Sequence, residues 1–117
     1  MGQTALETTT RRTAAGTTIE LAGDIDGGAR DALDGAYSML PDGDALLLDF
    51  THVGYINSTG IALIVGILAR ARAQERPVSA YGLTEHYREI FEITRLSDFM
   101  TIIADGHEPA ADHGGKP

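Results

Sequence analysis

The sequence predicts an α/β fold in which helices pack against a mixed β-sheet of four to five strands. Three observations lead to this expectation: two adjacent segments rich in β-branched residues near the start, alternating strand-like and helix-like segments after them, and one short segment that is apolar on both faces. A hairpin followed by such alternation is typical of a sheet with both antiparallel and parallel pairs. We expect one domain over residues 1–104.

The first two strands are expected at 4–10 and 17–22, separated by a turn at 14–16. In the second, Ile19 and Leu21 alternate with Thr18 and Glu20, which indicates one buried face. The sequence from Gly23 to Gly28 is rich in glycine and aspartate and is expected to break the strand.

An amphipathic helix is expected at 29–40, where apolar residues recur at helical spacing and a Pro-Asp-Gly turn follows. The next segment, 45–50, is a continuous apolar run bounded by turn residues, which favours a central strand covered on both faces. A loop through Gly54 is expected to follow it.

A long helix is expected from Ser58 to about Glu75, and Pro77 is expected to end it. Its apolar residues form two stripes, so we expect its first half to be buried on two sides or offered to a partner. The first stripe holds Ile61, Ile64, Val65 and Leu68, and the second holds Leu63 and Ile67. The cations Arg70, Arg72 and Arg76 lie in the last turns, where they favour the negative end of the helix dipole.

The remaining chain is expected to form a strand at 78–81, a helix capped by Thr84, and a last strand at 100–103. The helix carries Tyr87, Ile90 and Phe91 at helical spacing. Residues 105–117 are rich in Gly, Pro, Ala and charge without periodicity, which predicts a disordered tail.

Composition excludes several function classes. The formal net charge of −8 opposes binding to nucleic acid, and the absence of cysteine excludes disulfides and thiolate chemistry. No apolar run is long enough to span a membrane and the start lacks a signal-peptide core, so we expect a cytoplasmic protein without a membrane partner. The four histidines have no metal-ligand spacing, so we expect neither a metal nor an organic cofactor.

The most informative stretch runs from Asp49 to Leu63 and places the hydroxyl pair Ser58-Thr59 between a strand and an apolar helix. The side chain of Asn57 or Ser58 can cap the first free N–H groups of that helix. A helix N-terminus is equally suited to hold a phosphate. Both interpretations are compatible with the residues. Ser58 lacks the Gly-x-Ser-x-Gly setting of a nucleophile, and we find no catalytic constellation, so we expect no enzyme activity.

At this stretch the sequence resembles the STAS domain of the anti-sigma factor antagonist family. The resemblance lies in Tyr55-Ile56-Asn57-Ser58-Thr59-Gly60-Ile61 and in Leu21-Ala22-Gly23-Asp24-Ile25-Asp26, and it extends through 81–84 and 91–96. It covers the chain from about Thr4 to Ile103 and implies a STAS-like sheet with helices packed on it.

The resemblance implies a binding protein that sequesters an anti-sigma factor and thereby releases a sigma factor. In such a pathway the anti-sigma factor is a serine kinase that phosphorylates the position of Ser58, and a serine phosphatase reverses the step. The residue before the acceptor is commonly Asp in the family and is Asn57 here, which removes one negative charge from the surface offered to the kinase. The expected partner-binding residues are Asp24, Asp26, Asn57, Ser58, Thr59, Gly60 and Leu63.

Two alternatives stay open. Asp24 and Asp26 are equally suited to a turn and a helix cap without any contact to a partner. The whole domain is also compatible with a STAS-type scaffold subunit of a larger signalling or transport complex. The stand-alone length of the chain favours the phosphorylation switch.

Overall fold

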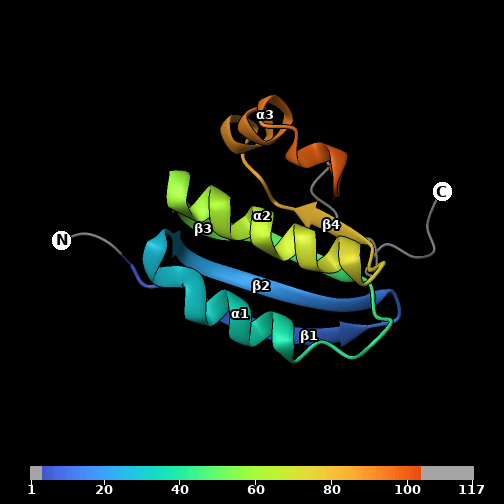
Figure 1. Ribbon diagram of the computed structural model, residues 1–117. Coiled ribbons are helices and arrows are strands. Elements are labelled where there is room, and N and C mark those ends of the chain that lie inside the picture. Colours follow the sequence, from blue (N-terminus) through green and yellow to red (C-terminus); the bar gives the residue numbers. More distant parts are fainter. Residues whose placement is uncertain (1–3, 104–117) are drawn as a thin grey trace.

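The computed structural model describes residues 4–103, which form a five-stranded sheet with the strand order β1-β2-β3-β4-β5 (Figure 1). The strands β1 and β2 pair antiparallel, and every following pair is parallel. This confirms the predicted mixed sheet. The predicted tail at 105–117 lies outside the described residues.

The hairpin joins β1 (Glu7–Thr13) to β2 (Gly16–Ile25). The second strand continues through the predicted break at Gly23, so that expectation was wrong. Gly23 has a φ of +116°, and a Cβ atom there would lie 2.6 Å from the carbonyl oxygen of Ala5. Glycine therefore allows the strand to pass close to the preceding chain at an irregularity in the register with the next strand.

The central strand is β3 (Leu46–Ile56). Leu46, Leu47 and Leu48 are all buried, which confirms that both faces of this segment are covered. The loop predicted through Gly54 is instead strand, because β2 pairs with β3 as far as Ile56. On its other side β3 pairs with β4 (Val78–Tyr81) only from residue 46 to residue 49.

Two helices lie side by side across one face of the sheet, α1 (Arg30–Ser38) and α2 (Ser58–Ala73), as Figure 1 shows. A short 3-10 turn, η1 (Gly27–Ala29), precedes α1. The third helix, α3 (Glu85–Ile93), follows β4 and leads through a second 3-10 turn, η2 (Leu96–Asp98), into β5 (Thr101–Ile102). The Thr84 side chain caps α3 as predicted, accepting a hydrogen bond of 3.2 Å from the Tyr87 N–H.

The buried face of α2 differs from the predicted stripe. Ile64, Ile67 and Leu68 lie in the core, whereas Val65 is 44% exposed. Ile67, which the sequence placed on the second apolar stripe, is therefore a core residue and not part of an exposed surface. Because α2 is apolar on nearly every side, helical spacing alone does not determine which side meets the sheet.

Arg76 is buried beyond the end of α2. Its guanidinium donates hydrogen bonds to the carbonyl oxygens of Pro41 at 3.2 Å and Asp44 at 2.6 Å, and to the Tyr37 hydroxyl at 3.2 Å. The arginine thus ties the end of α2 to the connection between α1 and β3. The sequence placed Arg76 with Arg70 and Arg72 in the last turns of the helix, whereas α2 ends at Ala73 and the Arg76 side chain is buried.

Candidate functional site at the β3–α2 junction

The junction between β3 and α2 is a single extended residue, Asn57, with φ of −97° and ψ of −177°. Its Oδ1 atom accepts a hydrogen bond of 2.8 Å from the Gly60 N–H, so Asn57 is the N-cap of α2. Of the two cap residues that the sequence allowed, the structure selects Asn57. Ser58 becomes the first helical residue, and its hydroxyl is not needed for capping.

Ser58 and Thr59 are both exposed at the start of α2. Neither hydroxyl has a hydrogen-bond partner among residues 4–103. Their backbone N–H groups belong to the first turn, where a helix offers no internal acceptor. The first turn holds no acidic residue, and the dipole of α2 points its positive end here. A phosphate dianion on Ser58 would therefore lie near backbone N–H groups that have no acceptor within the helix. It would meet no acidic side chain in the first turn of α2.

Gly60 fixes the start of α2 against the end of β2. It is buried, and a Cβ atom at this position would lie 1.9 Å from the carbonyl oxygen of Ile25. The same carbonyl accepts a hydrogen bond of 3.2 Å from the Asn57 N–H. The junction is thus held on its β2 side by one hydrogen bond and by close packing that only glycine permits.

The two predicted acidic residues lie at the same end of the sheet as Ser58. Strand register places Asp24 beside Tyr55, and a Cβ atom at Gly27 would lie 3.5 Å from Cγ2 of Thr59. The segment from Asp24 to Gly27 therefore borders the hydroxyl pair.

Both carboxylates also stabilise local structure. Asp26 accepts a hydrogen bond of 3.0 Å from the Gly28 N–H and so caps the turn before α1. Asp24 belongs to β2 rather than to a turn, and it accepts a hydrogen bond of 3.1 Å from the Thr4 N–H. Each side chain is half-buried, which leaves part of its charge facing solvent.

Leu63 lies in a groove of about 350 Å³ between α1 and α2. The groove begins at Thr59, its wall includes Ala62 and Leu63, and an ion pair of 3.2 Å between Arg70 and Asp34 borders it further along α2. Leu63 is half-buried. The groove thus extends the exposed surface from the hydroxyl pair along the helix.

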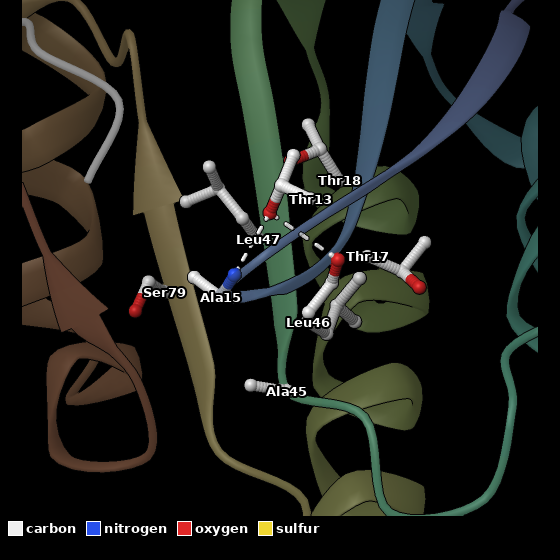
Figure 2. A pocket seen from close by; sticks show the side chains of 9 residues that line it. Thr13, Ala15, Thr17, Thr18, Ala45, Leu46, Leu47 and Ser79 are labelled. Carbon is white, nitrogen blue, oxygen red and sulfur yellow. Dashed lines mark hydrogen bonds between the residues drawn. The ribbon is translucent and has the colours of Figure 1, made fainter. Parts of the chain in front are cut away.

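Other parts of the molecule offer weaker candidates. A recess of about 110 Å³ lies between the hairpin and the starts of β3 and β4. Its lining includes Thr18, Leu47 and Ser79, which Figure 2 shows. It lies at the opposite end of the parallel strands from Ser58. His52 precedes Ile56 by four strand residues, roughly 13 Å at the usual rise, so it is not placed as a base for Ser58.

Within residues 4–103, no group of three or more potential ligands is placed to hold a metal ion. None of the described helices combines the length and apolar character needed to cross a bilayer.

One residue at the junction was not recognised from the sequence. The hydroxyl oxygen of Tyr87 in α3 accepts a hydrogen bond of 3.0 Å from the Ile56 N–H, two residues before Ser58. Helical spacing indicated only that Tyr87 shares a face with Ile90 and Phe91. No local pattern could have assigned this contact, because it depends on where α3 packs against β3.

Sequence comparison with known proteins identifies relatives of this chain. A family model described as "Mlab, STAS domain" matches residues 8–103. An anti-sigma-B factor antagonist of Listeria monocytogenes is 33% identical over 86 residues, which cover 72% of this chain and 75% of that protein. One from Staphylococcus aureus is 30% identical over 57 residues, covering 49% of this chain and 53% of that protein.

Solved structures show the same fold at lower identity. An anti-sigma factor antagonist from Mycobacterium paratuberculosis superposes with a TM-score of 0.65 at 20% identity, covering 84% of this chain and 85% of that chain. The antagonist SpoIIAA in its unphosphorylated form gives a TM-score of 0.64 at 15% identity, covering 86% of this chain and 88% of that chain. On the extent of the family match and the identity to the Listeria protein, this chain belongs to the STAS domain family of anti-sigma factor antagonists.

Proposed function

We propose that this protein is an anti-sigma factor antagonist switched by phosphorylation of Ser58. It binds an anti-sigma factor that is also a serine kinase, and the sigma factor held by that protein is released. Phosphorylation of Ser58 by the kinase ends the binding, and a serine phosphatase restores it. The protein acts as a substrate and a binding partner, not as an enzyme.

The observation that carries the proposal is the exposed hydroxyl of Ser58 at the start of α2, which has no hydrogen-bond partner in the described part of the chain. A kinase needs an acceptor oxygen that it can reach, and Asn57 leaves that oxygen free by taking over the cap. Curated relatives of this chain are named anti-sigma-B factor antagonists, and a solved structure with the same fold is described as SpoIIAA in the phosphorylated form.

The proposed partner surface comprises the exposed end of α2 and the neighbouring acidic segment. Ser58 and Thr59 form its centre, Asp24 and Asp26 its charged rim, and Leu63 its apolar extension into the groove. Asn57 and Gly60 contribute by setting the position of the helix start, since one caps it and the other is buried against β2.

The switch follows from a difference between the free and the bound protein. A phosphate adds about −1.5 to −2 charges at neutral pH, and the N-terminus of α2 can hold it at little cost to folding. In the complex the same charge must be desolvated near Asp24 and Asp26, against a surface shaped for a neutral hydroxyl. A penalty of about 2.7 kcal/mol weakens binding about a hundredfold.

The test is to incubate the protein with purified anti-sigma factor kinase and ATP and to map the phosphorylated residue. Wild type, Ser58→Ala and Thr59→Ala are compared for labelling and for binding. We expect labelling to disappear only in Ser58→Ala. Labelling lost only in Thr59→Ala would move the switch to the neighbouring hydroxyl.

No labelling of any variant, with binding retained, would favour the STAS-type scaffold instead. In that case the missing negative charge at Asn57 offers a physical reason, and Asn57→Asp tests whether the charge restores phosphorylation.

A further inference from the structure

The second half of β3 has an open edge. Its β4 neighbour ends at Tyr81, level with Asp49, so within residues 4–103 the part of β3 from Phe50 onward pairs with β2 alone. Backbone groups of a strand alternate between its two sides. The Asn57 N–H points toward β2 and donates to Ile25, and the Ile56 N–H consequently points to the open side.

Tyr87 occupies that open side. Its hydroxyl accepts the Ile56 N–H at 3.0 Å, where a further strand would otherwise supply a carbonyl. Its ring lines a small cavity with Phe50, Val53 and Leu83. Tyr87 therefore covers the open edge of β3 and also provides a hydrogen-bond acceptor for the Ile56 N–H. The Thr84 cap fixes the backbone of Tyr87, and the His86 ring packs edge-on against the Tyr87 ring at 4.9 Å between centroids.

We infer that Tyr87 is a positioning residue for the acceptor serine. Ile56 and Asn57 are consecutive, and their N–H groups are held from opposite sides by α3 and by β2. Asn57 in turn caps α2 through Gly60. The segment just before Ser58 is therefore held between α3 and β2. The Tyr87 hydroxyl is the side-chain group through which α3 contacts the backbone of this segment. The effect of this contact on the phosphorylation of Ser58 rests on the proposed function.

The hydroxyl can be removed without removing the ring. Tyr87→Phe keeps the covered edge and deletes only the acceptor for Ile56. The matched control is Tyr81→Phe, since the Tyr81 hydroxyl makes no hydrogen bond within residues 4–103. Small displacements of a reacting group cost large factors in rate, up to about a hundredfold for 1 Å. Loss of the hydrogen bond between Tyr87 and Ile56 should therefore lower the kcat of Ser58 phosphorylation more than it raises the KM of the kinase for this protein.

The first measurement is amide hydrogen exchange at single residues in the purified protein, which needs no partner. We expect the Ile56 amide to exchange at least about tenfold faster in Tyr87→Phe, beyond any change in the amides of β1 and β2, and to be unchanged in Tyr81→Phe. An Ile56 amide that exchanges equally in wild type and Tyr87→Phe would overturn the inference.

The second measurement is the rate of Ser58 phosphorylation by purified kinase and ATP. We expect kcat to fall about tenfold in Tyr87→Phe with KM within about twofold, and Tyr81→Phe to match wild type. An unchanged kcat despite faster exchange would also overturn the positioning role. Wild-type protein that is never labelled would refute the proposed function, while the exchange rates would still decide the part played by Tyr87.

Discussion

Asn57 Oδ1 and the Gly60 N–H are joined by a hydrogen bond of 2.8 Å that closes the first turn of α2 and leaves the Ser58 hydroxyl free. Asn and Asp are comparable N-cap residues, whereas Ala cannot accept the bond. We therefore expect Asn57→Ala to lower the free energy of unfolding by about 1 kcal/mol and Asn57→Asp to leave it nearly unchanged. Urea denaturation of the three proteins measures the difference, and equal stability of Asn57→Ala and wild type would contradict the cap.

The close approach of α2 to β2 predicts that Gly60 does not tolerate a side chain. Gly60→Ala would place Cβ 1.9 Å from the Ile25 carbonyl oxygen, so the helix start must move. We expect a loss of at least about 2 kcal/mol in the free energy of unfolding.

Gly66 in the same helix is the matched control, because it is exposed and a Cβ atom there meets nothing within 4 Å. Gly66→Ala should stabilise the protein by up to about 1 kcal/mol through helix propensity alone. A stabilising Gly60→Ala would show that the two elements are not packed as described.

The negative charges of Asp24 and Asp26 can be removed without removing the hydrogen bonds that these side chains accept. In the double variant Asp24→Asn and Asp26→Asn, the amide oxygens can still accept from the Thr4 and Gly28 N–H groups. We expect weaker and less salt-dependent binding to the anti-sigma factor, because the charges steer the encounter. Titration calorimetry at two ionic strengths tests this. Unchanged affinity at both would remove the two residues from the interface.

The buried guanidinium of Arg76 predicts a large stability effect far from Ser58. Arg76→Met fills similar space but leaves the Pro41 and Asp44 carbonyl oxygens without their donor. We expect a loss of about 2 to 3 kcal/mol, against less than about 0.5 kcal/mol for the exposed Arg72→Met. Thermal and urea unfolding provide the comparison. Equal effects of the two substitutions would mean that the Arg76 hydrogen bonds contribute little.

The features predicted correctly from the sequence are those that depend on neighbours along the chain. The start of α2 at Ser58, the strand 78–81 and the Thr84 cap each carry their signal within a few residues. The extension of β3 to Ile56 was missed because polar residues there remain in the strand only through pairing with β2. The contact between Tyr87 and Ile56 was missed for the same reason, since a second element supplies it.

The end of the sheet opposite Ser58 offers a place to attach a reporter. The hairpin turn holds the exposed Ala14, and the chain contains no cysteine of its own. A single Ala14→Cys substitution therefore creates a unique thiol that a fluorophore can modify, at the far ends of the strands that lead to the acceptor. A dye there would follow association and release of a partner by fluorescence anisotropy in real time, without altering the surface that carries the hydroxyl pair.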